Sequence, residues 1–218
     1  MAQPFNIVIA GVGGQGTVLA SKLLAQAALL QGAQVRTAET IGMAQRGGSV
    51  LGHVRVEAGT GPARAPLSPL VPLGGADLLI GFEPGETMRA LDYLAPGKTV
   101  VTAIRAIEPV QATLDTSAAT YDGTSHINWL QQQANTGRIG TLVTVDGEAL
   151  CAECGSPRVL NVILLGAAIA AVANNTVFSI DALERALEVL VKPRFVEMNK
   201  RALHRGLAEK SQRGHTAR

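Results

Sequence analysis

The segment Asn6-Ile-Val-Ile-Ala-Gly-Val-Gly-Gly-Gln-Gly-Thr17 is the most informative part of the sequence for the fold. Its apolar residues 7–10 are typical of a strand that is buried on both faces of a parallel sheet. The glycines that follow match the pattern GxGxxG, and apolar residues then recur at helical spacing until Gly32. A strand, a glycine loop and a helix in this order predict the start of an α/β domain.

The rest of the chain continues to alternate between strand-like and helix-like patterns. Strands are expected at residues 34–38, 50–57, 76–81, 98–103 and 141–145, and helices at residues 84–93 and 124–133. From residue 146 onward the pattern is helical, with helices expected at residues 157–172, 180–190 and 193–207, the second of them capped by Ser179 or Asp181. Residues 34–38 should complete a right-handed βαβ unit with the first strand.

These elements predict a three-layer, Rossmann-like α/β fold with a mostly parallel sheet and a helical C-terminal segment. A length of 218 residues suits one domain, which we expect to span residues 1–208, followed by a basic, flexible tail at residues 209–218. Hydrophobic residues make up 47% of the chain and aromatic residues only 3%, so the core must consist mainly of aliphatic side chains.

Composition also limits the cellular location and the partners. The N-terminus has no secretory signal pattern, and the longest apolar run, residues 159–173, is shorter than the roughly 20 residues that cross a bilayer. We therefore expect a cytoplasmic protein without a membrane segment. A net charge of +2, without aromatic residues interleaved among the basic ones, argues against nucleic acid as a partner.

The glycine loop is the first candidate binding site. Backbone N–H groups in such a loop, together with the positive end of the following helix dipole, hold a pyrophosphate or another anion. An acid after the second strand binds a ribose hydroxyl in dinucleotide enzymes, and Glu39 stands at that place, with a solvated glutamate as the alternative. The residues of this candidate site are Gly11, Gly13, Gly14, Gln15, Gly16, Thr17 and Glu39.

A second loop follows the second expected strand, and it should therefore lie at the same edge of the sheet. The guanidinium of Arg46 suits a phosphate or a carboxylate, and its neighbours add glycines and neutral hydrogen-bonding groups. A structural turn with an exposed arginine is the alternative. The residues of this loop are Gln45, Arg46, Gly47, Gly48 and Ser49.

No catalytic or metal-binding group stands out. Cys151 and Cys154 form a single CxxC, but a four-thiolate metal site needs a second pair, so we interpret them as structural thiols on a helix. The histidines have no ligand spacing, and we interpret them as packing or surface residues: His53, His126, His204 and His215. The residues alone describe a binding module without visible catalytic machinery.

Several strings match one known family in order and in spacing. They are residues 11–16, residues 39–50, His53-Val-Arg55, residues 75–84, residues 90–97, Asn161-Val-Ile-Leu-Leu-Gly166 and Val196-Glu-Met-Asn199. On these residues the chain resembles the gamma module of the 2-oxoacid:ferredoxin oxidoreductases, and most of all the small (beta) subunits of the indolepyruvate type. The resemblance covers nearly the whole chain.

The resemblance implies a division of labour between subunits. In that family a large partner subunit carries thiamine diphosphate, magnesium and iron–sulfur clusters. It decarboxylates an aryl 2-oxo acid, passes electrons to ferredoxin or a similar acceptor, and delivers the acyl group to coenzyme A. This chain would then be a non-catalytic subunit of a hetero-oligomer that assists the reaction and holds none of those cofactors firmly.

Two roles for the loops follow from the resemblance, and both stay open. The loops 11–17 and 45–49 would face the partner subunit and hold the phosphates of coenzyme A, or they would form the subunit interface with Arg46 paired to a partner carboxylate. Two other functions also remain as alternatives for the chain: a stand-alone oxidoreductase that binds NAD or FAD, and a purely structural or regulatory subunit.

Overall fold

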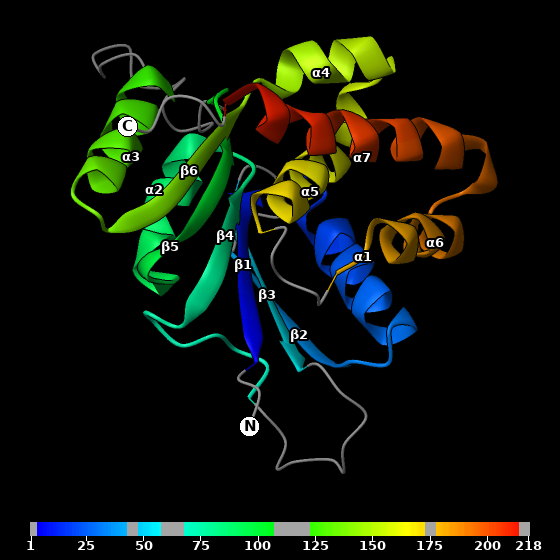
Figure 1. Cartoon of the computed structure of the whole chain (residues 1–218), viewed down its shortest axis with the longest axis horizontal. Coiled ribbons are helices and arrows are strands. Elements are labelled where there is room, and N and C mark those ends of the chain that lie inside the picture. Colours follow the sequence, from blue (N-terminus) through cyan, green and yellow to red (C-terminus); the bar gives the residue numbers. More distant parts are fainter. Residues whose placement is uncertain (1–3, 43–47, 58–67, 107–122, 173–177, 214–218) are drawn as a thin grey trace.

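The computed structural model describes residues 4–42, 48–57, 68–106, 123–172 and 178–213 (Figure 1). Within these ranges the chain forms a mixed six-stranded sheet covered by helices. The strands are β1 (Phe5–Val12), β2 (Gln34–Ile41), β3 (Ser49–Glu57), β4 (Ala76–Gly81), β5 (Leu94–Ala103) and β6 (Ile139–Val145). The helices are α1 (Thr17–Leu30), α2 (Pro84–Arg89), η1 (Leu91–Tyr93), α3 (Gly123–Asn135), α4 (Gly147–Cys154), η3 (Pro157–Val159), α5 (Leu160–Ala171), α6 (Ile180–Leu190) and α7 (Pro193–Arg213).

The sheet has the order β2-β3-β1-β4-β5-β6. Strands β1, β4, β5 and β6 are parallel neighbours, whereas β3 is antiparallel to both β1 and β2. The mostly parallel sheet is therefore confirmed. The predicted βαβ unit differs in one respect: β2 runs in the same direction as β1, but β3 lies between them, because β2 and β3 pair with each other as a hairpin.

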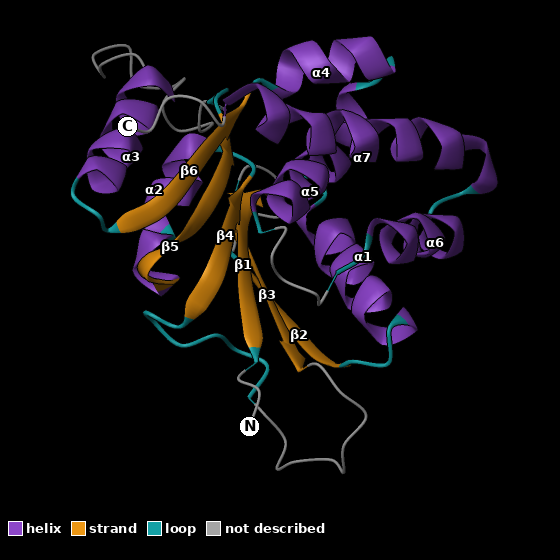
Figure 2. Cartoon of the chain, in the orientation of Figure 1, coloured by secondary structure: helices purple, strands orange, loops and turns teal. Residues whose placement is uncertain are grey.

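Helices cover both faces of the sheet, which confirms the three-layer α/β architecture (Figure 2). Helices α1, α5, α6 and α7 lie over one face, and their aliphatic side chains form the larger core with Ile7, Ile9 and Ile80. Helices α2 and α3 lie over the other face, where Val8, Leu79 and Val100 belong to a smaller core. The alternation of these side chains along β1 and β4 follows from the two-residue period of a strand.

The helical C-terminal segment packs on the sheet through α5, whose residues Asn161–Ile169 are all buried. Helix α7 crosses α5 at very short distance. A Cβ atom at Gly206 would lie 1.9 Å from the carbonyl oxygen of Ile163, and one at Gly166 would lie 2.2 Å from that of Leu203. The two glycines therefore allow the backbones of α5 and α7 to touch.

The helix boundaries agree with the sequence pattern in most places. Helix α6 has the expected bounds, and Ser179 caps it by accepting a hydrogen bond from the amide of Ala182. Helix α7 continues to Arg213, beyond the expected end at residue 207, so the boundary of the basic tail at residues 209–218 stays a prediction. Among the described residues, no single helix is long and apolar enough to cross a membrane, and the only combination that reaches the length, α4 with η3 and α5, is bent by 119°.

The contact between α5 and α7 gives a test in which two effects have opposite signs. In an isolated helix Gly206→Ala would be stabilising by up to about 1 kcal/mol. Here the added methyl group overlaps the backbone of α5, so we expect a net destabilisation on the order of 1–3 kcal/mol, with a fall in Tm of about 2–4 °C for each kcal/mol. Thermal unfolding of the purified chain measures this. Glu197→Ala, at an exposed position of the same helix, is the control, and a higher Tm for Gly206→Ala would contradict the close contact.

Candidate functional site

The glycine loop connects β1 to α1 at the carboxyl end of the parallel strands. Gly16 is the N-cap of α1 and has a φ of 85°, in the left-handed region that favours glycine. Its missing side chain also makes room for α5, because a Cβ atom at Gly16 would lie 2.7 Å from Nδ2 of Asn161. Gly14 has a φ of 103°, and a Cβ atom there would meet no other atom within 4 Å. Gly14 thus faces open space.

The side chain of Gln15 closes the gap between β1 and β4. Its Oε1 accepts a hydrogen bond from the amide of Val12 at 2.6 Å, and its Nε2 donates to the carbonyl oxygen of Phe82 at 2.9 Å. Gly11 makes room for this amide, since a Cβ atom at Gly11 would lie 2.9 Å from Oε1 of Gln15. Gln15 therefore occupies the crevice between neighbouring strand ends in which open α/β sheets commonly hold a ligand.

The two predicted loops lie side by side as far as the structure describes them. The amide of Gly13 donates to the carbonyl oxygen of Gly48 at 2.9 Å, and Ser49 begins β3 opposite Val12. Gln45, Arg46 and Gly47 lie outside the described residues. The structure thus brings Gly48 and Ser49 to the glycine loop.

The prediction that Glu39 closes the second strand is wrong. Strand β2 continues to Ile41, and Glu39 pairs with Gly52 in the middle of the β2–β3 hairpin. Its side chain is exposed, and β3 separates β2 from β1 and its glycine loop. A ribose-binding role of Glu39 stays a prediction, which the order of the strands does not favour.

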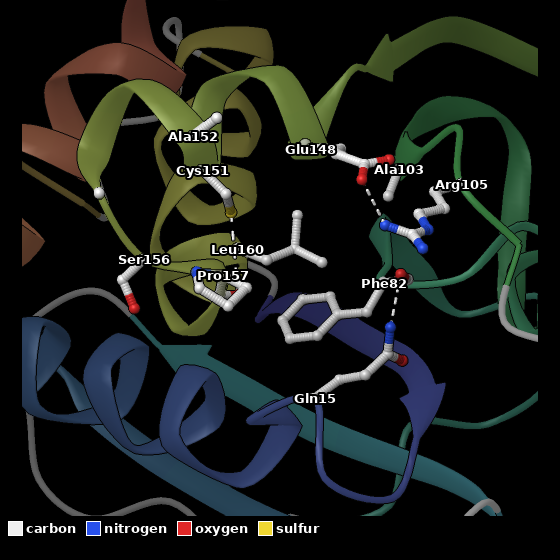
Figure 3. A pocket seen from close by; sticks show the side chains of 12 residues that line it. Gln15, Phe82, Ala103, Arg105, Glu148, Cys151, Ala152, Ser156, Pro157 and Leu160 are labelled. Atoms are coloured by element: carbon white, nitrogen blue, oxygen red, sulfur yellow. Dashed lines mark hydrogen bonds and ion pairs between the residues drawn. The ribbon is translucent and has the colours of Figure 1, made fainter.

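A cavity of about 510 Å³ lies beside the glycine loop at the carboxyl ends of the parallel strands (Figure 3). The loops after β4 and β5, helix α4 and the turn from α4 into α5 surround it. Its lining residues are Gln15, Phe82, Ala103, Arg105, Gly147, Glu148, Cys151, Ala152, Gly155, Ser156, Pro157 and Leu160. Among those residues predicted for the site that the structure describes, Gln15 is the only one in this lining.

Sequence reasoning missed the cavity, although one signal pointed to it. Phe82, Arg105 and Glu148 each stand within three residues after an expected parallel strand, and the carboxyl ends of such strands meet at one edge of the sheet. Leu160 and Pro157 gave no such signal, because their approach to Phe82 depends on how α5 packs on the sheet.

The charged and titratable groups of the cavity are few. Arg105 and Glu148 form an ion pair of 2.6 Å at its mouth, where both side chains are 66% exposed. Burial, followed by the nearby charges of Cys154 and Glu148, raises the pKa of Cys151 to about 11. Both cysteines lie in the C-terminal half of α4, away from the helix N-terminus that activates thiols, so the structural interpretation of the CxxC is supported.

The described part of the chain offers no fit to a metal or an iron–sulfur cluster. No group of three or more His, Cys, Asp or Glu side chains there is arranged to hold a metal ion. His53 is buried and accepts a hydrogen bond from the amide of Val71, and burial lowers its pKa. His204 is bonded to Glu184 at the surface. Packing and surface roles are thus confirmed for these two histidines.

Comparison with known proteins agrees with this architecture. The model of the pyruvate ferredoxin/flavodoxin oxidoreductase family matches residues 6–209. The chain belongs to this family. It is 36% identical over 205 residues to indolepyruvate oxidoreductase subunit IorB of Pyrococcus horikoshii, and the match covers 93% of this chain and 94% of the relative.

Two solved structures share the fold. The gamma subunit of a keto/oxoacid ferredoxin oxidoreductase from Geobacter sulfurreducens has a TM-score of 0.65 at 22% identity, and the match covers 95% of this chain and 99% of that one. The 2-oxoglutarate:ferredoxin oxidoreductase of Magnetococcus marinus has a TM-score of 0.66 at 18% identity, and the match covers 97% of this chain but 32% of that longer chain. The predicted fold of the gamma module is confirmed by both.

The Gln15 side chain gives a first test of the site. Gln15→Ala removes both hydrogen bonds and leaves the Val12 amide and the Phe82 carbonyl without this partner, so we expect a loss of about 1–3 kcal/mol in the free energy of unfolding. Denaturant titration of the purified chain measures the loss. Gln131→Ala, whose side chain is bonded to Asn135 on an exposed helix face, should change stability by no more than about 0.5 kcal/mol. Equal effects of the two substitutions would argue against the bridging role.

The raised pKa of Cys151 gives a second test. A pKa of about 11 in place of 9.0 lowers the thiolate fraction near neutral pH about a hundredfold, and only the thiolate reacts with iodoacetamide. We expect alkylation of Cys151 at pH 8, followed by mass spectrometry, to be at least tens of times slower in the folded chain than in the chain unfolded in urea. The rate should rise only as the pH approaches about 11. Similar rates in both states would show that the thiol is neither buried nor suppressed.

Proposed function

We propose that the chain is the small subunit of an aryl 2-oxo acid:ferredoxin oxidoreductase of the indolepyruvate type. The observation that carries the proposal is the match to the family over residues 6–209 together with 36% identity to an indolepyruvate oxidoreductase subunit over nearly the full length of both chains. The complex would convert an aryl 2-oxo acid and coenzyme A to the acyl-CoA and carbon dioxide in the cytoplasm, with ferredoxin or a similar protein as the electron acceptor.

The chemistry is assigned to a larger partner subunit. Iron–sulfur clusters are usually held by several thiolates, and the two cysteines of this chain are buried together on α4. Thiamine diphosphate, magnesium and the clusters are therefore proposed for the partner, where thiamine supplies the carbanion chemistry of decarboxylation. The contribution of this chain would be binding and orientation at the contact between the subunits.

The glycine loop would supply that contact. The first amides of α1 have no partner within the helix, and the N-cap Gly16 has no side chain to satisfy them, so the loop presents donors and a positive dipole end. The amides of Gly13 and Gln15 are already bonded within the protein, which leaves a smaller donor set than a pyrophosphate loop needs. A single phosphate of coenzyme A or a carboxylate of the partner subunit would fit this donor set.

A stand-alone dinucleotide enzyme is less well supported by the same geometry. Gln15 fills the crevice between β1 and β4, and Glu39 lies one strand too far from the loop. A purely structural subunit would share the fold but would show no dependence of coenzyme A affinity on the loops.

Co-purification from the native cell tests the subunit assignment. The tagged chain should bring down a large protein containing thiamine diphosphate and iron–sulfur clusters, and the complex should reduce a dye only when an aryl 2-oxo acid and coenzyme A are both present. A chain that purifies alone and reduces a nicotinamide or a flavin would overturn the assignment.

Arg46 tests the role of the loops within that complex. Arg46→Ala removes the guanidinium of the loop whose last residues are bonded to the glycine loop. We expect either a rise in the apparent KM for coenzyme A of roughly tenfold or more, or partial dissociation of the complex, because a charge-assisted hydrogen bond contributes about 1.5–3 kcal/mol. Arg185→Ala, which removes an exposed ion pair on α6, is the matched control. Intact assembly and an unchanged KM for Arg46→Ala would contradict both roles.

A further inference from the structure

The roles proposed for the glycine loops leave the neighbouring cavity without a function. Its volume of about 510 Å³ falls within the range of about 300–1,000 Å³ that small-molecule sites occupy. The lining is mostly apolar: Phe82 forms the floor, and Pro157, Leu160 and Cys151 lie beside it (Figure 3). This apolar part of the lining suits the body of an apolar ligand rather than a polyphosphate.

Among the described lining residues, the charged side chains lie together at one side of this cavity. Arg105 lies two residues after β5 and Glu148 in the first turn of α4, and among the described residues they are the only ionic side chains in the lining. The thiol of Cys151 is protonated and therefore neutral. Their ion pair is exposed, and pairs of this kind contribute little to stability. The two groups are therefore available to a ligand at little cost to the fold.

The combination of an apolar cavity with one positive and one negative group at its mouth restricts the ligand. An apolar anion would be attracted by Arg105 but repelled by Glu148. An apolar amine would be attracted by Glu148 but repelled by Arg105. A zwitterion satisfies both groups. Its anionic end accepts from the guanidinium, and its cationic end donates to the carboxylate.

We propose that this cavity binds a free amino acid with a large apolar side chain, held by Arg105 at its carboxylate, by Glu148 at its ammonium group, and by Phe82, Pro157 and Leu160 around its side chain. The site adjoins the glycine loop, with which it shares Gln15, and the inference does not depend on the proposed function. Such a site would bind an aromatic amino acid in preference to the corresponding 2-oxo acid, because only the amino acid has the ammonium group that Glu148 would recognise.

Isothermal titration calorimetry with the full chain tests the ligand class. The probes are tryptophan, 3-indolepropionic acid, which lacks the ammonium group, and tryptamine, which lacks the carboxylate. We expect tryptophan to bind and each of the two analogues to bind roughly tenfold more weakly or less, as expected for the loss of a charge-assisted hydrogen bond. Equal affinity for tryptophan and indolepropionic acid, or no detectable binding of tryptophan, would overturn the proposal.

Three variants locate the site. Arg105→Gln and Glu148→Gln should each weaken tryptophan binding roughly tenfold, and Ala152→Phe, at an exposed lining position, should abolish it by filling the cavity. Arg185→Gln is the matched control, because it breaks a similarly exposed ion pair on α6 and should leave binding unchanged. Circular dichroism verifies that each variant is folded.

The variants also separate the proposed ligand from a side chain of the partner subunit. If tryptophan fails to bind and Ala152→Phe instead prevents co-purification of the large subunit, the cavity belongs to the interface and the proposal is wrong. Binding of tryptophan that survives Ala152→Phe would equally contradict it, because the amino acid would then lie elsewhere on the chain.

Discussion

The hydrogen bonds of the Gln15 side chain hold together the part of the molecule on which both sites depend. One amide group joins the end of β1, through the N–H of Val12, to the end of β4, through the carbonyl of Phe82. The two hydrogen bonds fix the path of the glycine loop. They also fix the backbone of Phe82, whose ring forms the floor of the cavity. A glycine loop without this bridge would leave an open crevice at the β1–β4 boundary, as in dinucleotide-binding proteins.

The same bridge explains how a dinucleotide-like sequence pattern fits a family with a different task. Of the three glycines in GxGxxG, Gly11 makes room for Gln15 and Thr17, and Gly16 makes room for Asn161 while it adopts a positive φ. Two of the three therefore serve contacts inside the chain. The GxGxxG pattern predicts a tight turn between a strand and a helix. It does not predict the ligand, which depends on side chains that the pattern does not specify.

Local periodicity was enough to predict most of the fold. The period-two pattern of residues 50–57 and the apolar runs at 76–81 and 98–103 correspond to β3, β4 and β5, and the helix 180–190 has the observed bounds. The place of β3 between β1 and β2 was missed, because strand pairing is a tertiary choice that a single strand pattern does not encode. The error on Glu39 has the same origin, since the hairpin with β3 extends β2 by pairing Thr40 and Ile41.

Only the part of the candidate site that is formed by the backbone of the glycine loops could be predicted from the sequence. The loops that contain Gly13, Gly14 and Gly48 lie side by side in the structure. Each loop follows an expected strand in the sequence, and this position predicted that the two loops meet at one edge of the sheet. The cavity is different, because its walls combine Phe82 after β4, the ion pair of Arg105 and Glu148 from the loop after β5 and from α4, and Pro157 and Leu160 from η3 and α5. Most of the lining comes from residues 147–160, but the opposite wall is formed by Gln15, Phe82, Ala103 and Arg105, which come from distant parts of the chain. The cavity therefore follows only from the packing of α4 and α5 against the strand ends.

Helix α5 is thus the element that makes one site region out of distant parts of the chain. Asn161, in its first turn, is buried, and its Nδ2 donates to the carbonyl oxygen of Gly16 at 3.4 Å, while the neighbouring Leu160 lines the cavity. Five residues further along, Gly166 lets α7 approach to backbone contact. Helix α5 therefore contacts the glycine loop, the cavity and α7 through residues that lie within about two turns of one another. Helices α5, α6 and α7 therefore support the binding edge of the sheet, although Leu160 is the only one of their described residues that lines the cavity.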